Sequence, residues 1–202
     1  KEFKYIVLDN LLSKEALDKL YSFCLTNSIW SEFDYQNGYI GSFYENGFNS
    51  PLIIQISEEI KKRYPNIFKN FELTKAWGFK CNNKMKGVKI HADYSAINLN
   101  FWITPDEANL NKNTGGLLIW DKEAPKNWGF KKYNSDDKAI KNYLKKTNPK
   151  MKKIRYKSNR AMIFNANLFH ASDKCNFKNN YKSKRINVTL LYGRREDTER
   201  FQ

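Results

Sequence analysis

The chain has 202 residues, 41% hydrophobic and 15% aromatic, so it can bury a sizeable core as one globular domain over residues 1–202. The 36 Lys and Arg residues outnumber the 21 Asp and Glu residues and give a net charge of +15. No apolar run approaches the roughly 20 residues that a membrane-spanning helix needs, so the sequence excludes a helical membrane protein.

The first third of the chain predicts a strand and two helices. Residues 3–8 are apolar enough to form a buried strand. Residues 13–27 begin with a serine N-cap and continue with apolar side chains at helical spacing. Ser50 followed by Pro51 starts a second helix, which is expected to end before Pro65.

Between these helices, residues 31–50 combine glycines with many aromatic side chains. Two interpretations are open: an ordinary hairpin that packs its aromatic residues, or a mobile lid that covers a substrate. Tyr39 and Tyr44 are the candidates for substrate contacts in this segment.

From residue 71 onward the sequence changes to short β-strands separated by polar loops. Strands are expected over residues 72–81, 88–94, 95–104, 117–120, 152–157, 160–164 and 186–192. Residues 121–150 form an insertion with a helix that Ser135 would cap and that Ile140, Tyr143 and Leu144 would anchor. Two helices followed by such strands predict an α+β fold with a closed or sandwiched β core.

The chain contains only two histidines, and both are candidate metal ligands. His91 and Asp93 are two residues apart in a predicted strand, so their side chains point to the same face. His170 closes the apolar run that starts at Arg160, and a second strand would bring it to the same point. Two imidazoles and one carboxylate leave coordination positions for a co-substrate and O₂, which suits a non-haem Fe(II) better than zinc.

Arg185 starts the apolar strand that follows His170, and this order carries a resemblance. A His-x-Asp pair, a distal His and a basic residue opening the next strand resemble the signature of the Fe(II)/2-oxoglutarate dioxygenases. The segments HADYSAINLNFWITP, TGGLLIWD, NRAMIFNANLFH and RINVTLLYG are similar to a bacterial and phage branch of the prolyl-4-hydroxylase-like group, over residues 75–195. The resemblance implies a double-stranded β-helix, or jelly roll, with N-terminal helices packed on one sheet and a helical insertion.

The resemblance also implies the cofactors and the reaction. Fe(II), 2-oxoglutarate as co-substrate and O₂ would be required, and ascorbate would stimulate. Decarboxylation of 2-oxoglutarate to succinate and CO₂ would be coupled to hydroxylation of a C–H bond. His91, Asp93 and His170 would be the catalytic metal ligands, and Arg185 would form a bidentate ion pair with the far carboxylate of 2-oxoglutarate.

Strand alternation adds candidates on the same faces. If Arg185 points inward, Asn187 and Thr189 point inward too, and Thr189 can donate its hydroxyl to the same carboxylate. In the strand 95–104, Asn98, Asn100 and Trp102 share one face, whereas Leu99, Phe101 and Ile103 take the other.

Two uses of these asparagines remain open. Asn98 and Asn100 either bind the co-substrate or a metal-bound water, or they hydrogen-bond across strands. Trp102 is a candidate substrate contact.

The substrate is not fixed by the sequence. A peptidyl or prolyl substrate follows from resemblance alone, and the chain departs from that group because it has Arg185 instead of Lys and lacks a Y-x-x-G segment before the His-x-Asp. One alternative is a nucleic-acid demethylase, whose R-x-N-x-T-x-R pattern this chain matches except for Leu191 at the second Arg. The other is a jelly-roll binding module without catalysis.

Partners and location follow from charge and cysteine use. Lys makes up 29 of the 36 basic residues and occurs in dispersed clusters typical of solvated surface, so a nucleic-acid partner is open but not favoured. Small molecules or peptides are the favoured partners, and the oligomeric state is not indicated. Three widely spaced cysteines and no signal-peptide pattern indicate a reducing, cytoplasmic environment.

Overall fold

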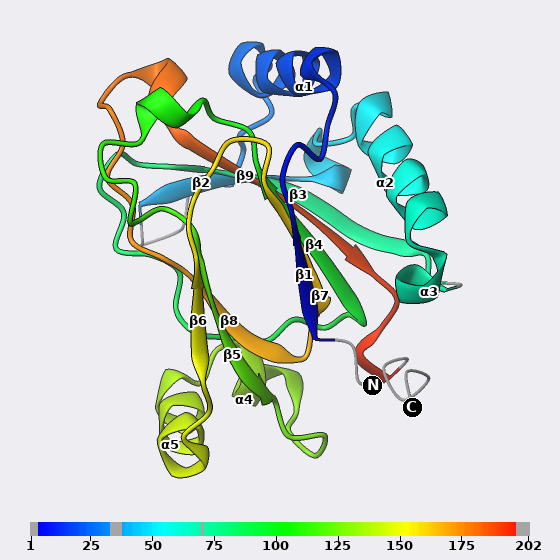
Figure 1. The fold of residues 1–202 in the computed structure, drawn as a ribbon, viewed down its shortest axis with the longest axis vertical. Helices are drawn as coiled ribbons and strands as arrows, with labels where there is room; N and C mark the ends of the chain where they lie inside the picture. Colours follow the sequence, from blue (N-terminus) through cyan, green and yellow to red (C-terminus); the bar gives the residue numbers. More distant parts are fainter. Residues whose placement is uncertain (1–3, 33–37, 70, 197–202) are drawn as a thin grey trace.

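Two antiparallel sheets form the centre of the computed structural model, which describes residues 4–32, 38–69 and 71–196 (Figure 1). The large sheet has the strand order β1-β7-β4-β9-β3-β2. Its strands are β1 Tyr5–Leu8, β2 Tyr39–Phe43, β3 Leu73–Cys81, β4 Ile97–Trp102, β7 Ala161–Asn165 and β9 Arg185–Tyr192. The small sheet has the order β6-β5-β8, with β5 Leu117–Glu123, β6 Met151–Ile154 and β8 Leu168–Ser172. The expected α+β fold class is confirmed.

Three helices cover the outer face of the large sheet: α1 Lys14–Thr26, α2 Pro51–Arg63 and α3 Pro65–Phe68. As expected, Ser13 caps α1 by accepting a hydrogen bond from Ala16 N at 3.2 Å, and Pro51 is the first residue of α2. Leu20 and Ile53 of these helices pack in one core with the outward-facing residues Leu99, Phe101, Val188 and Leu190 of β4 and β9. This packing fixes which face of each strand points inward.

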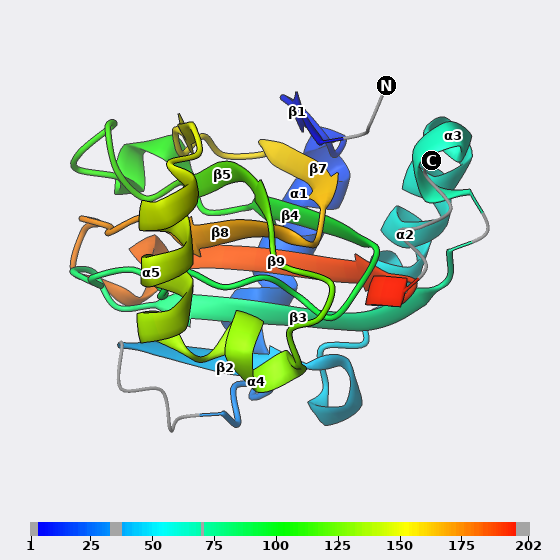
Figure 2. The ribbon, with the colours of Figure 1, turned by 90° about the horizontal axis from the view of Figure 1, so that it is seen from below.

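Two further helices, α4 Phe130–Asn134 and α5 Asp137–Thr147, cover the outer face of the small sheet, nearest the viewer in Figure 2. The expected anchors Ile140 and Leu144 are buried there, and Tyr143 packs beside them. The expected Ser135 cap is wrong, because the Asp136 carboxylate accepts the hydrogen bond from Ala139 N at 2.9 Å.

The prediction of a strand over residues 88–94 is wrong, because this segment is irregular apart from one bridge. Only His91 pairs with β8, through an isolated bridge to His170. The next two N–H groups turn away from that ladder, because Ala92 N donates to Tyr133 O and Asp93 N donates to Ala166 O. The second strand expected to carry His170 is β8, but its bounds were not predicted, because the buried run 160–170 divides into β7, a turn and β8.

The described part of segment 31–50 agrees with the hairpin interpretation. Glu32 and Gly41 form an isolated antiparallel bridge, and β2 extends the large sheet beside β3. Residues 33–37 lie outside the described residues, so the lid interpretation stays a prediction. Over the three described ranges, no helix combines the length and apolar composition needed to cross a membrane.

Gly116 permits a close approach of β5 and β6 on which the site depends. A Cβ atom there would overlap the Ile154 carbonyl oxygen and lie 2.8 Å from Tyr156 N. We expect Gly116→Ala to lower the free energy of unfolding by about 2–3 kcal/mol, as overpacking against backbone does. Gly129→Ala is the control, because a Cβ there meets nothing within 4 Å. Since Gly129 is the N-cap of α4, where Ala is less favourable than Gly, the change should still cost up to about 1 kcal/mol, less than Gly116→Ala. Urea unfolding of both variants measures the difference, and equal midpoints would contradict it.

Candidate metal centre

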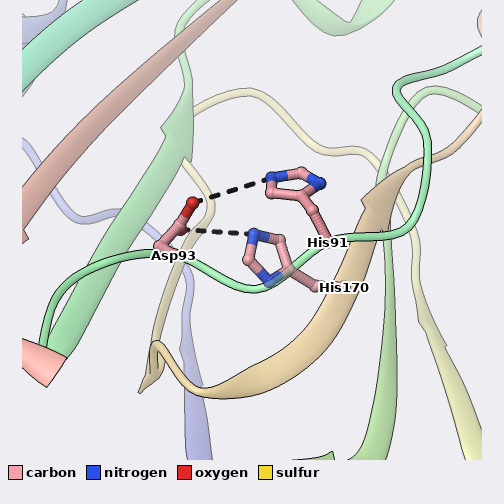
Figure 3. Close-up of side chains that lie close together, drawn as sticks. All are labelled: His91, Asp93 and His170. Atoms are coloured by element: carbon pink, nitrogen blue, oxygen red, sulfur yellow. Dashed lines mark ion pairs between the residues drawn. The ribbon is translucent and has the colours of Figure 1, made fainter. Parts of the chain in front are cut away.

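Three predicted ligands converge between the two sheets. The side chains of His91, Asp93 and His170 point toward one another (Figure 3), and their candidate ligand atoms all lie within 4.8 Å of one another. His91 Nε2 lies 3.7 Å from Asp93 Oδ1, and His170 Nε2 lies 3.4 Å from Asp93 Oδ2. The side chains of His170 and Asp93 are 5% and 9% exposed, whereas that of His91 is 20% exposed. The centre is therefore most accessible from the His91 side.

Backbone hydrogen bonds fix the two histidines opposite each other. His91 N donates to His170 O at 2.9 Å, and His170 N donates to His91 O at 2.8 Å. Asp93 is placed by a different contact, from its N–H to Ala166 O at 3.0 Å in the β7–β8 turn. His170 thus belongs to the hairpin β7–β8, and the backbones of His91 and Asp93 are hydrogen-bonded to it.

Both imidazoles have the tautomer that a metal requires. His91 Nδ1 lies 2.8 Å from Lys89 O, and His170 Nδ1 lies 3.0 Å from Leu168 O. A carbonyl can only accept a hydrogen bond, so each neutral ring carries its proton on Nδ1 and leaves a lone pair on Nε2. Such partners orient the rings of metal-binding histidines.

The charges of the centre suit a cation. Burial lowers the pKa of His91, and the neighbouring His170 lowers it further, so the His91 imidazole is neutral at pH 7. Burial alone would raise the pKa of Asp93, but the neighbouring imidazoles, in their protonated form, and a hydrogen bond from Asn98 lower it to about 2. The centre presents two imidazole nitrogens and one carboxylate, a donor set that fits a divalent transition metal.

Asn98 positions the carboxylate. Its Nδ2 donates to Asp93 Oδ2 at 2.6 Å, whereas its own Oδ1 is buried without a hydrogen-bond partner. The hydrogen bond occupies one carboxylate oxygen and leaves Oδ1 of Asp93 for the metal. This hydrogen bond to Asp93 is neither of the two uses expected for Asn98, and binding of the co-substrate or a metal-bound water by Asn98 stays a prediction.

A polar row continues from Asn98 along the inner face of the large sheet. Asn100 Nδ2 and Asn187 Nδ2 both donate to Thr189 Oγ1 at 3.0 Å. Trp102 Nε1 donates to Asn187 Oδ1 at 3.1 Å. The expected inward face of both strands is confirmed, and all members of the row are buried. Asn100 makes the cross-strand contact that was the alternative interpretation, although its Oδ1 has no partner.

Arg185 lies at the far end of this row and is 1% exposed. Its Nε donates to Gly115 O at 2.6 Å, and its Nη2 lies 3.5 Å from Asn187 Oδ1. Among the described residues, the hydrogen-bond partner of its Nη1 is the Cys81 sulfur, at 3.6 Å. Burial raises the pKa of Cys81 to about 11, so this neighbour is a neutral thiol. Within the described ranges, no carboxylate forms an ion pair with Arg185.

The two predicted tyrosines have different positions. Tyr39 in β2 lies on the inner face, opposite Cys81 and in ring contact with Phe79 at 4.9 Å. Tyr44 follows β2 in the short 3₁₀ helix Tyr44–Asn46, is 37% exposed and is not brought to the polar row.

Sequence reasoning missed the roles of Cys81 and Gly115 beside Arg185. Only the pair Gly115-Gly116, which signals a close backbone approach, pointed to this region.

Comparisons with known proteins place the fold. No protein-family model matches the chain, and no curated protein matches its sequence. Among solved structures, the non-haem α-ketoglutarate-dependent epimerase SnoN from nogalamycin biosynthesis has a TM-score of 0.70 at 9% identity, covering 96% of this chain and 79% of SnoN.

Two further structures extend this finding. HygX from Streptomyces hygroscopicus, with nickel and 2-oxoglutarate bound, has a TM-score of 0.66 at 8% identity, covering 95% of this chain and 83% of HygX. The viral collagen prolyl hydroxylase vCPH from Paramecium Bursaria Chlorella virus-1, in a 2OG complex, has a TM-score of 0.56 at 11% identity, covering 94% of each chain. The chain therefore shares the fold of these enzymes, as the resemblance of its motifs implied.

We expect His170→Ala and Asp93→Asn each to weaken Ni(II) binding by more than about 100-fold. Loss of a residue that only hydrogen-bonds to a metal ligand already costs about 10- to 100-fold in affinity, and loss of the ligand itself should cost more. Isothermal titration of the purified chain with Ni(II) measures this. Asp18→Asn, on the exposed face of α1, is the control and should bind like the wild type. If His170→Ala binds Ni(II) with the affinity of the wild type, these three residues do not form the metal site.

Asn98→Ala tests the carboxylate contact separately. Because it keeps all three ligands, we expect a smaller loss of Ni(II) affinity, about 10- to 100-fold. Unchanged affinity would mean that the Asn98–Asp93 hydrogen bond does not support the centre.

Proposed function

We propose that the chain is an Fe(II)- and 2-oxoglutarate-dependent dioxygenase built on a double-stranded β-helix. The two inward-facing sheets and the shared fold with SnoN, HygX and vCPH support this architecture. His91, Asp93 and His170 would hold the iron, since the convergence of their Nε2 and carboxylate atoms and the neutral state of His91 fit that metal.

The observation that carries the proposal is the buried guanidinium of Arg185. Removing a charge from water without a partner costs several kcal/mol, and breaking a buried pair costs about 3–5 kcal/mol. Arg185 has five N–H donors, and its described contacts are one carbonyl, one amide oxygen at 3.5 Å and one thiol. A carboxylate bound bidentately would compensate the charge and use the remaining donors.

The polar row supplies a second contact for this carboxylate. Thr189 Oγ1 already accepts two hydrogen bonds, from Asn100 and Asn187, so its own hydroxyl proton is left to donate into the space between the sheets. A ligand with a carboxylate at one end and a metal chelator at the other would match the chemistry of Arg185 and of the two histidines. 2-Oxoglutarate has this chemistry.

The protein's residues then position the reactants and exclude water. With 2-oxoglutarate and O₂, iron supplies an oxidant strong enough to hydroxylate a C–H bond while 2-oxoglutarate is converted to succinate and CO₂. The buried oxygens Asn98 Oδ1 and Asn100 Oδ1 would accept hydrogen bonds from water or from a substrate hydroxyl. Ascorbate would keep the iron reduced.

The substrate class we propose is a small molecule or peptide. SnoN comes from nogalamycin biosynthesis, and HygX has also been solved with hygromycin B bound. The third protein, vCPH, is a collagen prolyl hydroxylase. A nucleic-acid substrate is less favoured, since Leu191 is 3% exposed where the demethylase pattern requires a second arginine.

We expect Arg185→Gln to raise KM for 2-oxoglutarate at least about 30-fold, because truncating one partner of a buried charge pair costs about 2 kcal/mol or more. Succinate release with Fe(II) and ascorbate, without added substrate, measures this. Arg155→Gln, at an exposed arginine, is the control with unchanged KM.

Two outcomes would contradict the proposal. If wild-type protein that binds Ni(II) releases no succinate, the chain is the non-catalytic binding module. If Arg185→Gln retains the wild-type KM, the guanidinium does not bind the co-substrate.

A further inference from the structure

Cys81 is the direct cross-strand neighbour of Arg185. It is the last residue of β3, and the antiparallel register pairs it with the first residue of β9. Side chains of directly paired residues share a face, and their Cβ atoms are about 4.5–5.5 Å apart. Both residues are buried, and the Cys81 sulfur lies 3.6 Å from Arg185 Nη1. The residue at position 81 therefore decides what the guanidinium meets on this side.

One edge of the guanidinium is left for a carboxylate. Arg185 Nε carries a single N–H, which donates to Gly115 O at 2.6 Å. A carboxylate that pairs with two nitrogens of Arg185 must therefore use Nη1 and Nη2. Among the described residues, these nitrogens have two long contacts, to Cys81 Sγ at 3.6 Å and to Asn187 Oδ1 at 3.5 Å. Cys81 is thus one of the two side chains that border the remaining edge.

The side chain at position 81 is uncharged. Burial raises the pKa of the Cys81 thiol to about 11, although the nearby guanidinium favours the thiolate. A thiol is a weak hydrogen-bond acceptor, so it leaves the charge of Arg185 largely uncompensated and is readily replaced by a carboxylate oxygen. An aspartate at this position would instead place a carboxylate next to Nη1 and form a buried ion pair within the chain.

Another arginine shows that the chain can supply such a carboxylate. Arg160 donates from Nε and Nη2 to the two carboxylate oxygens of Asp9, at 2.6 and 3.0 Å. The side chain of Arg160 is 22% exposed, so water also stabilises its charge. Arg185 is more deeply buried and has the greater need of a counter-charge, yet it faces a thiol. This contrast favours a counter-charge that comes from outside the chain.

Resting on the proposed function, we propose that Cys81 reserves the Nη1–Nη2 edge of Arg185 for the distal carboxylate of 2-oxoglutarate. Cys81 acts as an uncharged positioning residue, because it borders this edge without neutralising the guanidinium. A carboxylate at position 81 would compete with the co-substrate for the same two nitrogens. Cys81→Asp therefore closes the co-substrate site by its charge, whereas Cys81→Asn has nearly the same shape and no charge with which to do so.

The matched pair Cys81→Asp and Cys81→Asn tests this at pH 7. We expect the Ni(II)-loaded Asp variant to bind 2-oxoglutarate at least about 10-fold more weakly than the Asn variant, because close charge pairs are coupled by about this factor or more. Isothermal titration measures both affinities. Cys24→Ser, at a buried cysteine of α1, is the control and should bind 2-oxoglutarate like the wild type.

A second measurement needs neither metal nor co-substrate. In urea unfolding of the metal-free protein, we expect the unfolding equilibrium constant of Cys81→Asp to be at least about 10-fold smaller than that of Cys81→Asn, because the new carboxylate compensates Arg185. The difference should disappear when both substitutions are combined with Arg185→Gln. A merely structural role of position 81 would not make the difference depend on Arg185.

Three results would overturn the proposal. The first is equal affinity of the two Cys81 variants for 2-oxoglutarate. The second is a Cys81→Asp variant that is less stable than Cys81→Asn, or that does not fold where Cys81→Asn folds. The third is a stability difference that persists with Arg185→Gln. If neither variant folds, Cys81→Glu and Cys81→Gln replace them with the same expectations.

Succinate release by the wild type separates this proposal from the oxygenase reaction. If the Cys81 variants differ as expected but the wild type releases no succinate, Cys81 and Arg185 form the carboxylate site of a protein without the reaction. If the wild type releases succinate and the two variants bind 2-oxoglutarate equally, the reaction stays and the role of Cys81 is removed. A Ni(II)-loaded wild type that binds no 2-oxoglutarate contradicts both.

Discussion

The register of β9 between β4 and β3 is the constraint on which the functional face depends. Arg185, Asn187 and Thr189 face the small sheet, and the residues between them join the core beneath the helices: Ile186, Val188 and Leu190. Burying each of these apolar side chains contributes about 1.5–3 kcal/mol. A slip by one residue would exchange the two faces and bury the guanidinium against the helices. Hydrophobic packing on one side therefore places the polar chemistry on the other.

Strand alternation and helix capping were the parts of the structure that the sequence could predict. The inward direction of the Arg185 side chain could be predicted from its own strand, because polar and apolar residues alternate regularly along it. Ser13 and the pair Ser50-Pro51 marked helix starts, because a cap satisfies backbone N–H groups locally. Each of these signals depends only on neighbours within a few residues.

Long-range pairing limited the rest. The run 160–170 contains a hairpin whose short turn, Ala166-Asn167, is buried between two apolar strands. Asn165 and Asn167 are residues that turns favour, but the apolar residues on both sides make the run resemble one continuous segment. Residues 88–94 have strand composition, yet the N–H of Asp93 bonds to that turn instead of a strand. The convergence of the histidines was still predicted, because the order of the two histidines, Asp93 and Arg185 resembles a known family, although the strand expected over residues 88–94 does not form.

The chain buries a second cation, and the contrast between the two explains why Arg185 points to a ligand. Lys80 is 4% exposed on the outer face of β3, and its Nζ donates to Cys24 O at 2.8 Å and to the Tyr181 hydroxyl at 3.1 Å. The Trp30 and Tyr181 rings lie 4.3 and 4.4 Å from this ammonium group. Cys24 belongs to the last turn of α1, where the helix dipole is negative.

The Lys80 charge is thus compensated by the protein itself through a helix end and two π faces. Among the described residues, no helix end compensates the charge of Arg185, and the centroid of the Trp102 ring lies 5.7 Å from its guanidinium carbon. Its guanidinium also has more donors than an ammonium group and a planar fork that suits two oxygens of one carboxylate. Of the two cations that are buried among the described residues, Lys80 is a structural contact between α1 and β3. The less fully compensated Arg185 is the one for which we propose a bound carboxylate.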